Sequence, residues 1–140
     1  MSKLQIQALT CEYQGKTILN DLALSLAENE ILALLGPSGC GKSTILRLIA
    51  GLDPQHPPTT GEVLVKGQSV TGPGADRGMV FQDYTSFSNR TVLDNVSFGL
   101  ECQGMAKEER YAEATEWIGR VGLDPKHDLH KYPHELSGGM

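Results

Sequence analysis

The chain has 140 residues, of which 39% are hydrophobic and 21% are charged, as expected for one soluble globular domain of ordinary size. Its formal net charge of −5, with no long run of lysine or arginine, argues against the basic surface that nucleic-acid binding needs. No apolar run approaches the roughly 18 residues of a membrane span, and the N-terminus lacks the apolar core of a signal peptide. We therefore expect a cytoplasmic protein with no nucleic-acid partner.

The cysteines and histidines give no sign of a disulfide framework or a structural metal site. The three cysteines are an odd number and lie far apart in the sequence. Three of the four histidines fall within residues 127–134, but no cysteine or carboxylate completes a recognised ligand pattern there. We interpret these histidines as solvated or hydrogen-bonding side chains.

Residues 4–27 alternate apolar and polar side chains, which predicts two antiparallel strands with one buried face each. A turn at Gly15-Lys16 is expected between them, and a second, shorter hairpin is expected over residues 61–70 with its turn at Lys66-Gly67. The apolar positions expected on the buried faces of the first two strands are Leu4, Ile6 and Ala8, and Leu22, Leu24 and Leu26.

Two other segments are continuously apolar. Residues 31–35 (ILALL) and 78–82 (GMVFQ) predict central strands that are covered on both faces. The stretches 53–61 and 71–78 are rich in proline, glycine and threonine, and they predict loops.

Helical spacing of apolar residues predicts three helices, over residues 42–52, 91–102 and 107–123. Gly51 and Gly122 are placed to end the first and third helices, and Thr91 is a candidate N-cap of the second. The apolar faces expected are Ile45, Leu48 and Ile49, then Val92, Leu93 and Val96, then Tyr111, Ala114, Ile118 and Val121, with Trp117 packed beside the last group.

Residues 36–43 (GPSGCGKS) match in full the pattern of a phosphate-binding loop, between an apolar segment and a predicted helix. Glycines let successive backbone N–H groups point into one concavity, and the helix N-terminus adds the positive end of its dipole. Lys42 supplies a mobile charge for the β- and γ-phosphates, the Ser43 hydroxyl can bind Mg²⁺, and Thr44 can contact the α-phosphate. A glycine-rich turn that binds nothing is the alternative. The nucleotide-binding residues expected here are Gly36, Pro37, Ser38, Gly39, Cys40, Gly41, Lys42, Ser43 and Thr44.

Three further features separate kinases, GTPases, helicases and transport ATPases, which all carry such a loop. They are Tyr13 in the N-terminal strand region, Gln82 at the end of GMVFQ, and LSGGM at residues 136–140. With them, the sequence resembles the ATP-binding subunit of ABC transporters over its whole length. The stretches TGPGADRGMVFQDY and YPHELSGGM are most similar to the branch that serves nitrate, sulfonate and taurine importers.

The resemblance implies a role for each matching position. Tyr13 would stack on adenine, and Gln82 would direct its amide oxygen to Mg²⁺ or the attacking water. Ser137, Gly138 and Gly139 would contact the γ-phosphate of ATP held by a second copy. Simpler interpretations remain for each: a half-buried strand tyrosine, a strand-end glutamine and a Ser-Gly-Gly turn.

The resemblance also implies the fold, an α/β P-loop NTPase core of the ABC type with an antiparallel β-subdomain. Residues 1–85 would form this partial core and β-subdomain, and residues 86–140 the start of an α-helical subdomain. The implied cofactors are ATP and Mg²⁺, with Ser43 and Gln82 near the metal and Lys42 and Gln82 as the catalytic residues.

The implied function is to couple ATP binding and hydrolysis to uptake of a nitrate-, sulfonate- or taurine-like solute through a membrane permease. Two copies would pair head to tail on the cytoplasmic face of the membrane, with a solute-binding protein acting indirectly. Two departures concern the signature motif and the permease surface. Met140 stands where Gln is commoner, and residues 83–92, where relatives carry an aromatic-bearing docking stretch, are polar at Ser88-Asn89-Arg90. An ABC-type ATPase of DNA repair or translation is disfavoured by the acidic charge.

The hydrolytic half of an ABC site does not occur in these 140 residues. The Walker B Asp, catalytic Glu and switch His follow the signature motif in the family, and neither Asp83 nor Glu135 follows an apolar core strand as a substitute would. We therefore interpret the chain as a truncated N-terminal part that binds ATP but scarcely hydrolyses it, with an ATPase as its full-length parent. A non-catalytic nucleotide-binding module is the alternative. The strand expected at residues 31–35 would then have an unpaired flank, so we also expect marginal stability.

Overall fold

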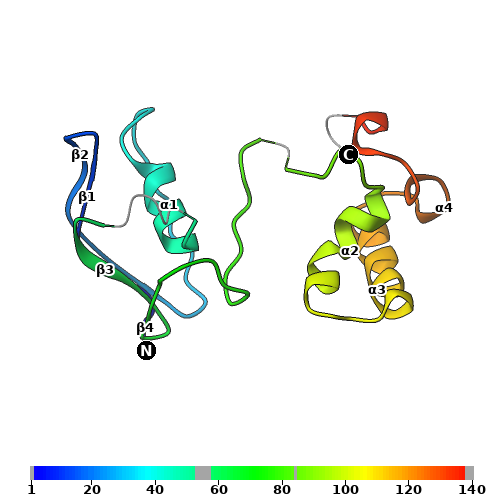
Figure 1. The fold of residues 1–140 in the computed structure, drawn as a ribbon, viewed down its shortest axis with the longest axis horizontal. Coiled ribbons are helices and arrows are strands. Elements are labelled where there is room, and N and C mark those ends of the chain that lie inside the picture. The colour runs from blue at the N-terminus through cyan, green and yellow to red at the C-terminus, as the bar shows by residue number, and fades with distance from the viewer. Residues whose placement is uncertain (1, 53–57, 84, 138–140) are drawn as a thin grey trace. The chain divides into compact units, whose positions relative to one another are not determined.

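The computed structural model describes residues 2–52, 58–83 and 85–137 (Figure 1). The chain divides into two compact units, Met1–Val80 and Phe81–Met140. In these described residues, the first unit contains a sheet and one helix, and the second is helical. Within the described ranges, no helix has the length and apolar character needed to cross a bilayer.

The first unit is built on an antiparallel sheet, which in the described part of the chain has the strand order β2-β1-β3-β4. The hairpin predicted between β3 and β4 is confirmed, and its turn lies at Lys66 and Gly67, with φ of 51° and 79°. Positive φ at both positions is the requirement of a type I′ two-residue hairpin turn. The strands are β1 (Ser2–Tyr13), β2 (Lys16–Ala27), β3 (Thr60–Val65) and β4 (Gln68–Ser69).

The turn between β1 and β2 lies one residue earlier than the predicted Gly15-Lys16. Tyr13 pairs with Lys16, so the turn residues are Gln14 and Gly15, with φ of 50° and 76°. Gly15 thus occupies the second turn position, where glycine adopts positive φ without strain. Lys16 is the first residue of β2.

A bulge in β1 changes which side chains face the core. Ala8 has a φ of 47°, and the register of β1 against β2 shifts between Ile6 and Leu9. The expectation that Ala8 shares a face with Ile6 is therefore wrong, because the extra residue at a bulge moves the following side chains to the other face. Leu9 is fully buried instead, and Ala8 is exposed. In β2 the predicted alternation holds, with Leu22, Leu24 and Leu26 half-buried between exposed neighbours.

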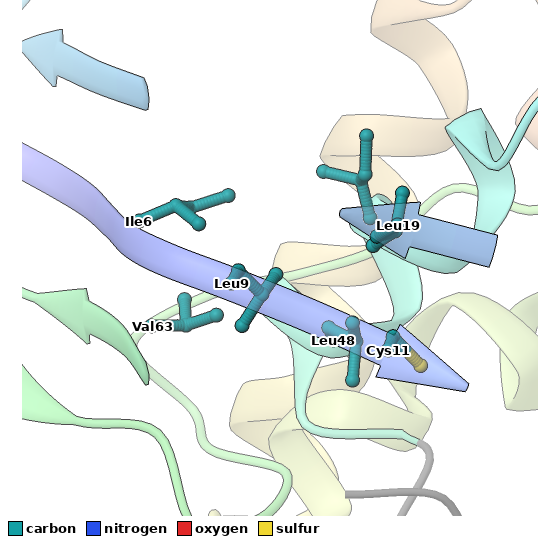
Figure 2. Close-up of a cluster of buried hydrophobic side chains, with 7 residues drawn as sticks. Ile6, Leu9, Cys11, Leu19, Leu48 and Val63 are labelled. Atoms are coloured by element: carbon teal, nitrogen blue, oxygen red, sulfur yellow. The ribbon is translucent and has the colours of Figure 1, made fainter. Parts of the chain in front are cut away.

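Helix α1 (Lys42–Ala50) packs on the sheet, as the helical spacing predicted. Ile45 and Leu48 are buried and Ile49 is partly buried against the same cluster. Gly51 ends the helix in the left-handed conformation, with φ of 70°, which confirms it as the C-cap. Figure 2 shows the cluster at close range, with side chains from three strands and the helix meeting in one core. Its members are Ile6, Leu9, Cys11, Leu19, Ile45, Leu48 and Val63.

The two predicted central strands are not formed. Residues 31–35 and 78–82 are irregular, and Ile31, Leu35 and Val80 are 96%, 91% and 98% exposed. A strand covered on both faces needs backbone partners beside it. Among the described residues, no segment pairs with either stretch. Leu34 alone of the first stretch packs against the core cluster.

The second unit consists of three helices and one short 3-10 turn in its described residues. Val92, Leu93, Ala114 and Ile118 form its core, and Tyr111 packs partly buried against it. The elements are α2 (Val92–Cys102), α3 (Lys107–Arg120), α4 (Pro125–Asp128) and η1 (Pro133–Glu135).

The ends of α2 and the start of α3 match the predictions, whereas α3 ends at Arg120 rather than at the predicted residue 123, and parts of both apolar faces were wrong. The Thr91 hydroxyl accepts from Asp94 N at 3.2 Å in a capping box, and Gly122, with φ of 87°, follows the end of α3. Val96, Val121 and Trp117 are 44%, 72% and 51% exposed, so their predicted packing is wrong. Val121 lies at the C-cap, beyond the helical face, and Ser97 takes the buried position in α2.

Candidate nucleotide-binding site

The candidate phosphate loop leads directly into α1, and it leaves the helix N-terminus uncapped. Gly41 is the N-cap with φ of 99°, no side chain accepts a hydrogen bond there, and no acidic residue occupies the first turn. The first backbone N–H groups of a helix have no acceptor within it. Those of Lys42, Ser43 and Thr44 thus face an end that carries the positive pole of the helix dipole. This arrangement suits an anion.

Lys42 folds back over the loop that precedes it. Its Nζ donates to the carbonyl oxygens of Gly36 at 2.8 Å and Pro37 at 2.7 Å, and lies 3.5 Å from the Cys40 Sγ. These partners are neutral, so an anionic phosphate would attract the ammonium more strongly than the loop does. Lys42 is therefore held beside the loop where a phosphate is proposed to bind. None of these three contacts is a carboxylate that would compete with the phosphate for its ammonium group.

Two glycines of the loop lie close to neighbouring side chains. A Cβ on Gly36 would lie 2.8 Å from the Cys40 Sγ. A Cβ on Gly41 would lie 2.9 Å from the Leu19 Cδ2 and 3.4 Å from the Ile18 carbonyl oxygen, so the loop packs tightly against β2 at this point. The core of the sheet thus fixes the position of the loop.

The remaining predicted residues of the first unit lie on its surface. Pro37, Ser38, Cys40 and Ser43 are exposed, and Thr44 is half-buried. Tyr13 is 46% exposed at the end of β1, beside the hairpin turn. The structure brings the loop residues together with the start of α1, and their roles toward a nucleotide stay predictions.

The other predicted site residues, Gln82 and Ser137 to Gly139, fall in the second unit. Gln82 and Ser137 are both exposed there, and Gly138 and Gly139 lie outside the described residues. Ser137 lines a groove of about 690 Å³ on this unit. Val96, Trp117 and Val121 contribute the apolar surface of this groove.

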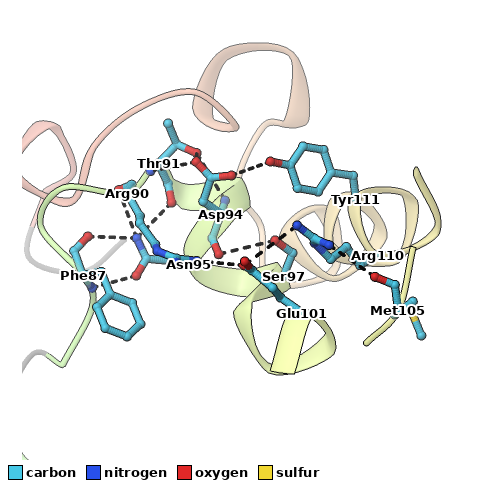
Figure 3. A network of polar contacts seen from close by, with 10 residues as sticks. All are labelled: Phe87, Arg90, Thr91, Asp94, Asn95, Ser97, Glu101, Met105, Arg110 and Tyr111. Atoms are coloured by element: carbon cyan, nitrogen blue, oxygen red, sulfur yellow. Dashed lines mark hydrogen bonds and ion pairs between the residues drawn. The ribbon is translucent and has the colours of Figure 1, made fainter. Parts of the chain in front are cut away.

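The second unit also contains a polar network that was not predicted from the sequence (Figure 3). Asn95 on α2 makes four hydrogen bonds to the backbone of the loop before the helix. Asp94 accepts from the Tyr111 hydroxyl at 2.5 Å and the Thr91 hydroxyl at 2.7 Å. Chiefly because of the Tyr111 bond, the pKa of Asp94 is lowered, and the same bond raises the pKa of Tyr111. The only signal for this network in the sequence was an asparagine about one turn after the start of a predicted helix.

Potential metal ligands do not gather elsewhere. In residues 2–52, 58–83 and 85–137, no three His, Cys, Asp or Glu side chains form a group that could hold a metal ion. His127 lies 3.7 Å from Asp124, and the His134 ring stacks on Tyr132. A hydroxyl such as that of Ser43 fits Mg²⁺ as one ligand among phosphate and water oxygens.

The family follows from sequence comparison with known proteins. A family model described as "ABC transporter" matches residues 19–140. The chain belongs to the ABC transporter family. The phosphate loop and α1 both lie within the matched part of this ABC protein.

Relatives agree with the family, and each aligns with 98% or 99% of this chain. An uncharacterized ABC transporter ATP-binding protein of Methanocaldococcus jannaschii is 51% identical over 142 residues, covering 99% of this chain and 51% of its own length. The nitrate import ATP-binding protein NrtD of Synechocystis is 47% identical, with 98% and 51% covered. The taurine import ATP-binding protein TauB of Escherichia coli O157:H7 is 44% identical, with 98% and 52% covered. The chain thus spans about half the length of these relatives.

A solved structure supports the fold. It is the dimeric structure of a post-hydrolysis state of an ATP-binding cassette bound to ADP and Pi. It matches 96% of this chain and 63% of its own with a TM-score of 0.78 at 30% identity. The ABC chain therefore has the α/β P-loop NTPase fold of that class, with an antiparallel sheet and a helical part.

Proposed function

We propose that the chain is part of the ATP-binding subunit of an ABC importer, and that residues 36–44 bind Mg²⁺-ATP. The observation that carries the proposal is the uncapped start of α1 beside Lys42, whose ammonium contacts two loop carbonyls and the Cys40 thiol. Backbone N–H groups at this helix start would receive the phosphates. Lys42 would exchange the carbonyls of Gly36 and Pro37 for the β- and γ-phosphates.

Other residues would complete the nucleotide site. Ser43 and Gln82 would contact Mg²⁺ or the attacking water, and Tyr13 would stack on the adenine. Bound Mg²⁺ would neutralise charge that develops on the phosphates. The signature residues Ser137, Gly138 and Gly139 would contact ATP held by a second copy. The dimeric structure of the related cassette with ADP and Pi supports the pairing of two copies.

The importer assignment is supported by the names of two relatives, which import nitrate and taurine. In this proposal, ATP binding closes the two copies and hydrolysis reopens them, which drives a membrane permease between its two states. The subunit would lie peripherally on the cytoplasmic face of the membrane. The solute would be a small anionic or zwitterionic compound such as nitrate, a sulfonate or taurine, delivered by a solute-binding protein.

Hydrolysis is assigned to a full-length parent. The Walker B Asp, catalytic Glu and switch His that the family carries do not occur in these 140 residues, which span about half of the relatives. Phosphoryl transfer depends on positioning and electrostatics, so these 140 residues alone should bind ATP and scarcely turn it over.

Two measurements on the native gene product test the proposal. A mass well above 15.1 kDa, together with Mg²⁺-dependent ATP binding, would support the importer subunit, whereas a mass of 15.1 kDa with binding but no turnover would favour a non-catalytic module. Lys42→Ala should weaken ATP binding by about tenfold or more, the loss expected for a charge-assisted contact. Lys126→Ala is the control, since Lys126 is exposed on the second unit. Unchanged ATP affinity in Lys42→Ala would contradict the site.

A further inference from the structure

The backbone of residues 129–131 is hydrogen-bonded to the start of α2. The Val92 N donates to the Lys131 carbonyl oxygen at 2.8 Å, and the Leu93 N donates to the Leu129 carbonyl oxygen at 3.0 Å. These are the first two N–H groups of the helix, and such groups find no acceptor within it. The start of α2 therefore fixes a segment that lies well after α3 in the chain.

Lys131 is also held through its side chain. Its Nζ lies 2.7 Å from the Asp128 Oδ1, and the other carboxylate oxygen of Asp128 accepts from the Asp124 N at 2.8 Å. Asp128 is only 4% exposed, and a buried carboxylate without a partner is strongly destabilising. The bond from Lys131 lowers the pKa of Asp128, so this carboxylate stays ionised at neutral pH. Lys131 thus joins α4, through its ammonium group, to α2, through its carbonyl oxygen.

The chain from Lys131 to Ser137 is short, and local contacts fix most of it. The Tyr132 N donates to the Glu135 Oε2 at 2.7 Å, and the Glu135 N donates to the Tyr132 carbonyl oxygen at 2.9 Å. The Leu136 side chain then packs against the core of the second unit. Ser137 follows directly and is exposed. A displacement of Lys131 would therefore be passed on to Ser137.

The Lys131 ammonium group is not needed to start either helix that it joins. Thr91 and Asp94 form a complete capping box at the start of α2. Asp124 caps α4 by accepting from the Lys126 N at 2.9 Å. The ion pair with Asp128 instead lies after α4, at the point where the chain turns toward Ser137.

We propose that Lys131 is a positioning residue for Ser137. Paired with Asp128 and bonded to the start of α2, it fixes the point from which the chain runs to Ser137. The inference rests on the proposed function, in which Ser137 contacts ATP held by a second copy. Its effect should therefore appear in the pairing of two copies and in hydrolysis. ATP binding to one copy should not depend on it, because the candidate phosphate loop belongs to the first unit.

The test compares Lys131→Met with Lys126→Met in the native gene product. Lys126 is an exposed lysine of α4 and serves as the matched control. The ATP affinity of dilute, unpaired protein should be the same in both variants and in the unaltered protein. Lys131→Met should raise the dissociation constant of the pair formed with Mg²⁺-ATP, measured by sedimentation, and lower kcat, each by about tenfold. Lys126→Met should change neither quantity.

Lys131→Arg separates positioning from a general loss of stability. Arginine can still donate to the Asp128 carboxylate, so it should restore both pairing and kcat. Should Lys131→Met fail to fold, Lys131→Gln replaces it, because an amide keeps a donor without the charge.

Three results would overturn the inference and leave the proposed function standing. They are unchanged pairing and kcat in the uncharged variant, a loss of ATP affinity in one copy as large as the loss of kcat, and no recovery in Lys131→Arg. If the unaltered protein binds ATP but its copies do not pair, the inference is overturned and residues 36–44 keep their proposed role. If the unaltered protein binds no ATP, both the inference and the proposed function are overturned.

Discussion

The fit of the phosphate loop against β2 can be tested with two glycine substitutions. Gly41→Ala would place a methyl group 2.9 Å from the Leu19 Cδ2 and 3.4 Å from the Ile18 carbonyl oxygen, at a φ of 99°. Gly39→Ala would be placed at a φ of 80° with no heavy atom within 4 Å. The two variants share the backbone strain and differ in the contact. The comparison therefore isolates the packing of the loop.

The expected magnitudes follow from these two terms. Left-handed backbone costs an alanine about 1–2 kcal/mol in either variant. Displacing the Leu19 methyl from a packed core adds about 1–3 kcal/mol for Gly41→Ala only. The gain from a stiffer unfolded chain is the same in both and cancels in the comparison. Gly41→Ala should therefore be less stable than Gly39→Ala by about 1 kcal/mol or more.

Urea unfolding of the native gene product measures the difference. With a slope of about 2 kcal/mol/M, a change of 1 kcal/mol moves the midpoint by about 0.5 M. The slopes of the two variants must agree for the midpoints to be compared. Equal midpoints, or a lower midpoint for Gly39→Ala, would refute the inference that Leu19 supports the loop.

Two further predictions concern the bulge in β1 and the network on α2. Leu9→Ala should destabilise the protein by about 2–5 kcal/mol, as for a fully buried leucine, whereas Ala8→Ser should change stability by less than about 0.5 kcal/mol; a large cost at Ala8 would contradict the register. Because hydrogen bonds lower the pKa of Asp94, its contribution to stability is present above the unfolded pKa of about 3.9 and is lost as the pH falls through the folded pKa. Asp94→Asn should thus cost about 1–2 kcal/mol in urea unfolding at pH 7 and less at pH 3, and a cost that does not shrink in acid would exclude this origin.

Local signals in the sequence predicted the parts of the fold that depend on few neighbours. Helix α1, the turn at Lys66-Gly67 and the cap at Thr91 are each encoded within about ten residues. The β1–β2 turn was predicted one residue too late. Gly15 favours a turn, but a glycine can occupy either of the two turn positions, so its presence alone does not fix which neighbour shares the turn.

The errors arose where structure depends on distant partners. Ala8 looked like a core position because alternation assumes regular pairing, which the bulge interrupts. Residues 31–35 and 78–82 have the composition of central strands. A central strand also needs neighbouring strands to pair with, and the composition of a segment does not show whether these neighbours are present. Val121 has helical spacing and lies just past the helix end. Asn95 was missed because its partners are backbone groups, which no side-chain pattern reveals.

The pairing of β1 with β3 has a consequence for the order of events in folding. The β1–β2 hairpin joins neighbouring residues and can form within about 1–10 μs. Pairing of β3 with β1 brings Thr60 to Ala8, 52 residues away in the sequence. A long loop must therefore close before these two strands can pair. The candidate phosphate loop and α1 lie within this long loop. The nucleotide binding proposed for residues 36–44 should therefore begin only in the slower phase of refolding, after β3 has docked.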